Sequence, residues 1–217
     1  MAVKVLLVDD DALVRAGLRM MLSAAEDIVV VGEASDGAAA VTAVQAHRPD
    51  VVLMDIRMPE VDGITATSRL RELPDPPQVI VLTTFHVDDY VLRALRGGAS
   101  GFLLKDTPPG DILDAVRRVA AGDAMLSPAV TRTLLAHVAD HDLNDRRADA
   151  RQRLATLTER EREVAVAVGS GATNAEIGAQ LFMSEGTVKA HVSRLLGKLD
   201  APNRVHIAII VHDAALS

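Results

Sequence analysis

The sequence predicts a doubly wound α/β domain with a five-stranded parallel sheet, followed by an all-α domain that contains a helix-turn-helix. Over the first 125 residues, short apolar runs alternate with segments whose apolar residues recur at helical spacing. From Leu157 onward only helical patterns occur. A chain of 217 residues is long enough for two such domains, and its 49% of apolar residues can build a core in each.

Five apolar runs are the expected strands of the first domain. Each is short and mostly apolar, as expected for strands buried on both faces of a parallel sheet. They cover residues 3–8, 28–33, 51–54, 79–82 and 101–104. Helical spacing follows each of them, over 13–22, 37–46, 63–73, 88–96 and 108–121. This alternation favours right-handed crossovers and places functional residues at the carboxyl ends of the strands.

The pattern changes after residue 125. Ser127 and Pro128 are typical of the cap and the first residue of a helix, which we expect to reach about residue 137. Residues 139–153 are polar and are interpreted as a linker, with a continued helix as the alternative. We therefore expect one domain over 1–123 and another over 154–217, joined by a linker with a helix over 124–153.

Four helices are expected in the second domain, over residues 159–168, 174–181, 185–199 and 204–214. Two pairs of residues fit a capping box, Thr158 with Glu161 and Thr173 with Glu176. Ser184 and Asn203 are suitable N-caps for the last two helices. Only residues 182–184 separate the second helix from the third, and this turn is short enough for a helix-turn-helix.

Charged residues follow three of the predicted strands. Asp9, Asp10 and Asp11 follow the first strand, Asp55 follows the third, and Lys105 follows the fifth. With these three strands side by side, all of these charges would meet at one edge of the sheet. Neighbouring carboxylates repel each other, and a divalent cation relieves that repulsion. Because Mg²⁺ prefers carboxylate, phosphate and water oxygens, the cluster predicts a site for a metal ion and a phosphoryl group.

The predicted chemistry gives each of these residues a role. Asp55 would be the nucleophile, Mg²⁺ would neutralise developing charge, and Lys105 would pair with a phosphoryl oxygen. Thr83 ends the fourth strand and could offer its hydroxyl to the same group. The alternative interpretation is purely structural: an aspartate caps the first helix, Asp55 opens a loop, and Thr83 ends its strand.

Four ordered segments of the first domain resemble the receiver domain of bacterial response regulators, which has a flavodoxin-like fold. They are residues 6–11 (LLVDDD), 55–63 (DIRMPEVDG), 81–84 (VLTT) and 101–106 (GFLLKD). The resemblance spans the whole domain, and its motifs are highly specific. It implies that Asp55 accepts a phosphoryl group from a sensor histidine kinase.

The resemblance also implies what surrounds the phosphoryl group. Mg²⁺ would lie among Asp9, Asp10, Asp55 and the carbonyl group of Arg57. In such receivers the hydroxyl at the Thr83 position follows the phosphoryl group, and the aromatic residue at the Phe102 position turns inward. Many members have tyrosine where Phe102 stands. Because Thr83 and Lys105 can bond the new oxygens only by moving toward them, the face around residues 88–96 is expected to shift.

The long helix expected over 185–199 has two different faces. Its core face carries Val188, Val192, Leu195 and Leu199. The opposite face carries small residues flanked by cations, namely Gly186, Ala190, Ser193 and Gly197 beside Lys189 and Arg194. Small residues let a helix enter the major groove of DNA, and flanking cations reach phosphates or guanine edges. A generic three-helix bundle or a protein-interaction module is the alternative.

Three segments of the second domain, residues 157–164, 174–178 and 184–192, are similar to the LuxR-type helix-turn-helix. The whole chain is thus similar to response regulators of the NarL/FixJ type. The resemblance implies base contacts by Lys189, Ala190 and Ser193, and DNA-backbone contacts by Thr187 and Arg194. It also implies a homodimer when phosphorylated, with RNA polymerase as a further partner. The last helix, with Val205, Ile209 and Val211, resembles a dimer contact or packs within its own bundle.

Composition sets limits on these functions. The net charge is −7, and residues 154–217 hold six basic and seven acidic residues, so global charge does not favour nucleic-acid binding. We therefore expect DNA binding to need two domains on adjacent half-sites and to depend strongly on salt. The sequence has no run of 18 apolar residues and no secretory signal, which predicts a cytoplasmic protein. It has no cysteine, which excludes disulfides.

The sequence predicts a regulator and not an enzyme. The enzyme alternative is an aspartate-nucleophile phosphatase of the haloacid dehalogenase kind. Such enzymes usually have an acid/base aspartate two residues after the nucleophile, and Arg57 stands at that position. Another alternative keeps the first domain and gives the second domain a protein or RNA ligand.

Overall fold

The computed structural model describes residues 2–83, 88–126 and 143–214, which divide into two compact units. The first unit contains the residues up to 120 and the strand at 125–126. The second contains residues 121–123 and the helices from 143 onward. The helix expected from Ser127 to about residue 137 lies outside the described residues. Within those ranges, no helix is long and apolar enough to cross a membrane.

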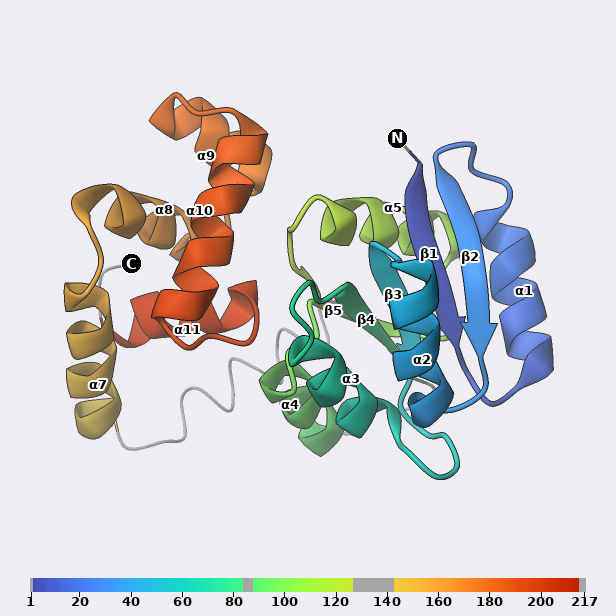
Figure 1. Ribbon diagram of the computed structural model, residues 1–217. Coiled ribbons are helices and arrows are strands. Elements are labelled where there is room, and N and C mark those ends of the chain that lie inside the picture. The colour runs from blue at the N-terminus through green and yellow to red at the C-terminus, as the bar shows by residue number, and fades with distance from the viewer. Residues whose placement is uncertain (1, 84–87, 127–142, 215–217) are drawn as a thin grey trace. The chain divides into compact units, whose positions relative to one another are not determined.

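The first unit is built on a parallel sheet with the strand order β2-β1-β3-β4-β5-β6 (Figure 1). The strands are β1 Val3–Val8, β2 Ile28–Ala34, β3 Val51–Asp55, β4 Gln78–Thr83, β5 Gly101–Leu104 and β6 Met125–Leu126. The doubly wound parallel sheet and its five predicted strands are confirmed. The sixth strand, β6, pairs with β5 at the edge. A run of two residues is too short to give a strand pattern in the sequence.

The strand order corrects one expectation about the charged residues. β1 and β3 are neighbours, but β4 lies between β3 and β5. The first, third and fifth strands are therefore not all side by side. Two strand spacings amount to about 9.5 Å. Lys105, just after β5, still reaches Asp55 because its long side chain passes over the carboxyl end of β4.

Within the described residues, five helices accompany the sheet: α1 Ala12–Leu22, α2 Gly37–His47, α3 Gly63–Arg71, α4 Asp88–Arg96 and α5 Pro109–Ala120. The side chains of Asp11, Asp36 and Asp62 cap the first three helices by accepting bonds from backbone N–H groups. On one face of the sheet, α1 and α5 bury residues such as Leu22 and Val116 against β1 and β3. Figure 1 shows α2 and α5 on opposite faces.

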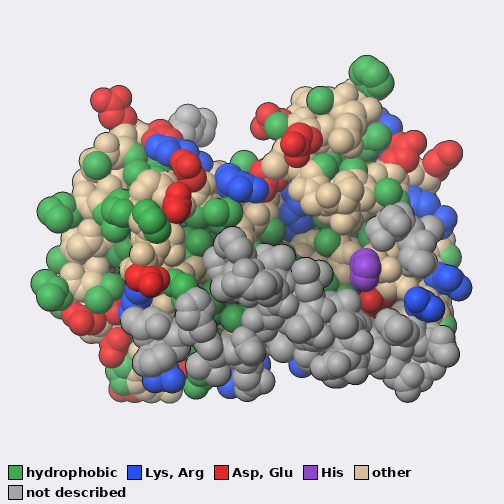
Figure 2. Space-filling view, turned by 180° about the vertical axis from the view of Figure 1, so that it is seen from behind, with side chains coloured by type: hydrophobic (Ala, Val, Ile, Leu, Met, Phe, Trp, Pro, Cys, Tyr) green, Lys and Arg blue, Asp and Glu red, His purple; other side chains and the backbone are tan. Residues whose placement is uncertain are grey.

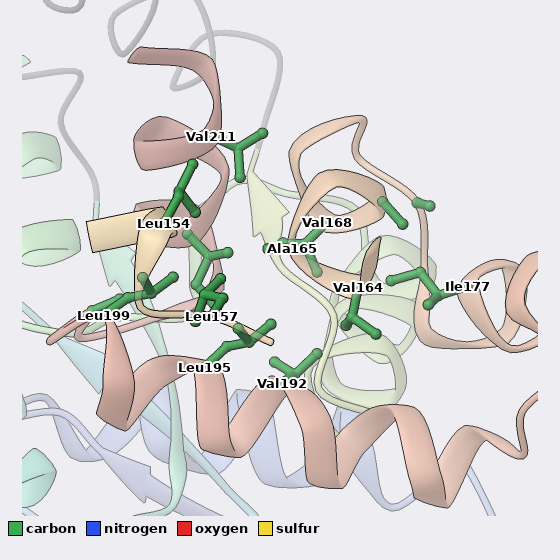
Figure 3. Packing of buried hydrophobic residues seen from close by; sticks show 14 of the residues in the cluster. Leu154, Leu157, Val164, Ala165, Val168, Ile177, Val192, Leu195, Leu199 and Val211 are labelled. Atoms are coloured by element: carbon green, nitrogen blue, oxygen red, sulfur yellow. The ribbon is translucent and has the colours of Figure 1, made fainter. Parts of the chain in front are cut away.

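The helices of the second unit are α7 Leu143–Ala155, α8 Glu159–Gly169, α9 Asn174–Leu181, α10 Glu185–Lys198 and α11 Arg204–Asp213. The four helices predicted after residue 157 are confirmed to within one residue at each end. Both capping boxes form, and Ser184 and Asn203 cap α10 and α11. In the core, Val192 and Leu195 of α10 point toward Val164 of α8 (Figure 3).

Helix α7 occupies much of the segment that the sequence suggests is a linker. Its residues Ala150 and Leu154 are buried in the core of the second unit, and Figure 3 shows Leu154 there. The predicted domain start at residue 154 therefore leaves out a helix that packs with this unit. The segment resembles a linker because few apolar positions interrupt its charged residues, so it shows little helical periodicity.

Candidate functional site

Three carboxylates gather at the carboxyl end of the sheet. Asp9 and Asp10 follow β1, and Asp55 is the last residue of the neighbouring strand β3. One carboxylate oxygen of each residue lies within 4.8 Å of the others. Asp9 and Asp55 are buried, with 1% and 6% of their surface exposed, whereas Asp10 is exposed. Like charges that are this close and this buried need a cation nearby.

Lys105 supplies one such cation. Its Nζ lies 2.5 Å from Asp9 Oδ2 and 3.0 Å from Asp55 Oδ1. Burial raises the pKa of Asp55, and the hydrogen bond from Lys105 only partly opposes this rise. Burial alone would lower the pKa of Lys105, but its bonds with Asp9 and Asp55 raise that pKa overall. The ammonium group therefore stays protonated between two buried carboxylates.

The same cluster has the donor set of a Mg²⁺ site. Three carboxylates and one lysine leave two negative charges, which a divalent cation would balance. Asp9 Oδ2 is buried and is held by the Lys105 ammonium group, with no further hydrogen bond among the described residues. An oxygen in this state can still serve as a metal ligand. The residues present therefore fit the predicted ion.

The loop between β3 and α3 fixes the orientation of Asp55. The Arg57 N–H donates to Asp55 Oδ2 at 3.1 Å, and the Gly63 N–H donates to the Ile56 carbonyl at 2.9 Å. A Cβ atom on Gly63 would lie 1.8 Å from the Asp55 carbonyl oxygen, so only glycine fits there. The close turn fixes the backbone at Asp55, and the bond from the Arg57 N–H orients one oxygen of its carboxylate.

Thr83 and Phe102 lie on the two strands beyond Asp55. Thr83 ends β4 and is buried, and its carbonyl accepts a hydrogen bond from the Lys105 N–H at 2.8 Å. Thr83 is thus at the same sheet edge as the acidic cluster. Phe102 is paired with Val81 in register and is only 1% exposed. The parts that these two residues play in switching stay predictions.

An open cavity of about 620 Å³ adjoins the acidic cluster. Its lining includes Asp10, Arg57 and Asp62, together with Tyr90 and Arg93 of α4. The sequence pattern does not single out the two residues of α4, because nothing local links that helix to the loop after β3. The available signal is that Tyr90 is the only tyrosine of the chain and precedes Arg93 by one helical turn.

Helix α10 exposes all five residues predicted to contact DNA, namely Thr187, Lys189, Ala190, Ser193 and Arg194. Its opposite face is the predicted core face, and Val188 and Leu195 there are fully buried. On the visible face of each unit, acidic and basic side chains are interspersed (Figure 2). The case for a DNA interface therefore depends on the shape and placement of α10 and not on a broad basic patch.

Lys198, the last residue of α10, is paired with an acid. Its Nζ lies 2.8 Å from Glu161 Oε2. That oxygen also accepts bonds from the N–H and the hydroxyl of Thr158, both at 2.9 Å, as part of the capping box of α8. The bond from Lys198 lowers the pKa of Glu161 to about 2, and the Thr158 N–H adds to this effect. Glu161 therefore remains ionised and neutralises one cation of α10.

Helix α11 uses most of its apolar residues inside its own unit. Ile207 and Val211 are fully buried in the core that contains Leu154 and Val168. Ile209 is only partly buried. Val211, one of three residues considered for a dimer contact, thus packs in the bundle, while Ile209 retains exposed surface.

The chain matches two known families along most of its length. The response regulator receiver domain matches residues 5–117, and the luxR family of bacterial regulatory proteins matches residues 155–211. The transcriptional regulatory protein LiaR of Bacillus subtilis is 40% identical over 211 residues, which cover 97% of each chain. The nitrate/nitrite response regulator protein NarL of Escherichia coli K12 is 36% identical over 208 residues, which cover 96% of this chain and 94% of NarL.

A solved structure gives the same result. The response regulator ChrA of a heme-sensing two-component system is 36% identical, and the match covers 100% of this chain and 99% of ChrA with a TM-score of 0.54. The fold, the acidic cluster and these relatives define a two-component response regulator with a receiver domain and a LuxR-type DNA-binding domain. The chain belongs to the NarL/FixJ type of this family, as its sequence motifs predict.

Proposed function

We propose that a sensor histidine kinase phosphorylates Asp55 and that this phosphorylation controls dimerisation, sequence-specific DNA binding and transcription. The observation that carries the proposal is the meeting of three carboxylates with Lys105 at the carboxyl end of the sheet. The receiver domain would cover residues 1–123 and the DNA-binding domain 154–217. The intervening segment would link them, with α7 packed on the DNA-binding domain.

In this proposal Asp9, Asp10, Asp55 and the Arg57 carbonyl hold Mg²⁺. The bound ion would neutralise the charge of the phosphoryl oxygens. Support comes from the two negative charges that Lys105 leaves unbalanced and from the buried Asp9 Oδ2, which Lys105 alone contacts as a cation among the described residues. Asp10, the one exposed acid of the three, gives the ion an open side from which to enter.

In the transfer step, a carboxylate oxygen of Asp55 attacks the phosphorus atom of the phosphohistidine of the kinase. The P–O bond forms as the P–N bond breaks, and the imidazole nitrogen leaves with the electron pair of that bond. Asp55 Oδ2 accepts the Arg57 N–H, whereas Oδ1 faces Lys105. We assign the attack to Oδ1, because Lys105 can then pass from this carboxylate to a phosphoryl oxygen.

After transfer, the new group presents three strong acceptor oxygens and added negative charge. Lys105 would pair with one oxygen, and the Thr83 hydroxyl would turn toward another. Thr83 is already at this edge of the sheet, where its carbonyl accepts a hydrogen bond from the Lys105 N–H. Phe102 has no hydroxyl, so packing alone would keep it inward. The switched surface would be the one formed by α4 and the end of β5.

For DNA recognition, Lys189, Ala190 and Ser193 would face bases, while Thr187 and Arg194 would contact the backbone. Their exposure on one helix with a buried opposite face supports this arrangement. With Lys198 paired to Glu161, a single domain has few cations for phosphates. Two domains on an inverted repeat would add their contacts, and RNA polymerase would then meet the bound dimer.

Labelling with a phosphodonor tests the first half of the proposal. Asp55→Asn should abolish incorporation, and Asp75→Asn, which changes an exposed acid outside the cluster, should leave it intact. Retained labelling of the Asp55 variant would place the nucleophile elsewhere.

Selection of bound DNA from a random pool, with and without the phosphodonor, tests the second half. We expect an inverted repeat that is enriched more strongly with the donor and is bound with strong salt dependence. Equal affinity at low and moderate salt, or enrichment of no sequence, would contradict the proposal.

A further inference from the structure

The ring of Tyr90 in α4 lies close to two guanidinium groups. Arg57 Cζ is 5.8 Å from the ring centroid, and Arg93 Cζ is 6.0 Å from it. Arg93 is one helical turn away on the same helix, but Arg57 comes from the loop after β3. The contact between Arg57 and Tyr90 therefore joins α4 to the loop that holds Asp55.

Arg57 touches the phosphoacceptor and α4 at the same time. Its backbone N–H donates to Asp55 Oδ2 at 3.1 Å, while its side chain lies at the Tyr90 ring. Arg57, Tyr90 and Asp10 all line the open cavity of about 620 Å³ beside the acidic cluster. Arg57 is exposed, and open space therefore separates its side chain from the acidic cluster.

We propose that the Arg57 side chain is a phosphoryl-binding residue that rests on Tyr90 until Asp55 is phosphorylated, and that its transfer to the phosphoryl group releases α4. This inference rests on the proposed phosphorylation of Asp55. A guanidinium makes shorter and stronger bonds with phosphate oxygens than with the face of an aromatic ring, and its planar fork fits two oxygens together. The charge that phosphorylation adds therefore draws Arg57 from the ring.

This link is independent of the aromatic residue in β5. Phe102 is 1% exposed and has no hydroxyl, so it has no polar group that could change partners on phosphorylation. Arg57, in contrast, carries a guanidinium group that could exchange the Tyr90 ring for the phosphoryl group. It therefore couples the state of Asp55 to α4.

The chain is suited to a direct test because Tyr90 is its only tyrosine and it contains no tryptophan. Intrinsic fluorescence of the full chain therefore reports Tyr90 alone. The probe is Mg²⁺ with beryllofluoride, a mimic of the phosphoryl group, and occupancy is followed separately by the thermal shift. Because the departure of Arg57 uncovers part of the ring, we expect the acrylamide quenching constant to rise by up to about twofold at saturation.

Variants of Arg57 and Arg93 distinguish the proposed link between Arg57 and α4 from the phosphorylation site itself. Arg57→Ala should have the raised quenching constant without the probe and show no further rise with it. If the alanine variant does not bind the probe, Arg57→Gln replaces it, and the same result is expected. Arg93→Ala is the matched control, because it removes the other guanidinium at the ring. Its acrylamide quenching constant should be raised without the probe and should still rise further with it.

Each outcome either supports or overturns the proposed link between Arg57 and α4. A thermal shift without a quenching change in the unmodified chain would overturn the link and leave the phosphorylation proposal standing. An equal rise in the Arg57 variants would also overturn the link. Absence of any thermal shift would remove the Asp55 site and the link together, whereas a rise in the unmodified chain and Arg93→Ala only would establish the link.

Discussion

Replacement of Lys105 by methionine tests the electrostatics of the receiver site without any kinase. The change removes the ammonium group that lies 2.5 Å from Asp9 and 3.0 Å from Asp55. Methionine keeps an unbranched side chain of similar length, so packing changes little. Asp9 and Asp55 would then face each other at neutral pH without a positive partner.

The size of the effect follows from the geometry. Two charges no more than 4.8 Å apart repel by at least roughly 3–4 kcal/mol at an effective dielectric constant of about 20. Uptake of a proton by one carboxylate limits this loss, so we expect Lys105→Met to lower the free energy of unfolding by about 2–3 kcal/mol in metal-free buffer. For a domain of this size the change corresponds to a fall in melting temperature of about 6–12 °C.

Calorimetry of the full chain measures this difference, with Lys4→Met as the matched control because Lys4 is exposed on β1. The loss should shrink as the pH falls, since protonated carboxylates no longer repel each other, and it should shrink when Mg²⁺ is added. Equal melting temperatures of the variant and the unmodified chain in metal-free buffer would refute the reasoning, as would a loss that Mg²⁺ leaves unchanged.

Three further changes test other parts of the molecule. Gly63→Ala places a Cβ 1.8 Å from the Asp55 carbonyl oxygen, so chemical denaturation should show a loss of more than about 3 kcal/mol; near-native stability would contradict the close approach. The pKa of Glu161 is about 2, below its ordinary 4.5, so its stabilisation is present above pH 4.5 and is lost as the pH falls toward 2. Urea titrations should show that Glu161→Gln reduces the dependence of the free energy of unfolding on pH in this range. An unchanged dependence would contradict the ion pair with Lys198. Arg194→Ala should weaken DNA binding for all sequences and lower the salt slope by about 1, and a change of sequence preference alone would assign Arg194 to bases.

Local sequence signals predict most of the fold. Strands buried on both faces give short apolar runs, and capping residues such as Thr158 and Ser184 mark helix starts because their side chains bond to N–H groups only two or three positions away. The acidic cluster is predictable for a related reason. Topology alone brings the carboxyl ends of parallel strands together, so residues far apart in sequence can be assigned to one site.

Features that depend on long-range packing are not visible in the sequence. Helix α7 has too few apolar residues to show a face, and only its docking through Leu154 makes it part of the second unit. The pairing of Lys198 with Glu161 joins residues 37 positions apart, and no pattern predicts it. The contact between Arg57 and Tyr90 likewise exists only because α4 packs near the loop after β3.

The bonding of Glu161 has a consequence for how DNA specificity can change. A single carboxylate ties the first turn of α8 to the last residue of α10, the helix proposed to carry the recognition surface. Under the proposed mode of DNA binding, the tilt of that surface would depend partly on Glu161, a residue outside the proposed base contacts. Substitutions at Glu161 or Lys198 could therefore change operator preference, because they would alter the angle at which unchanged side chains of α10 enter the groove.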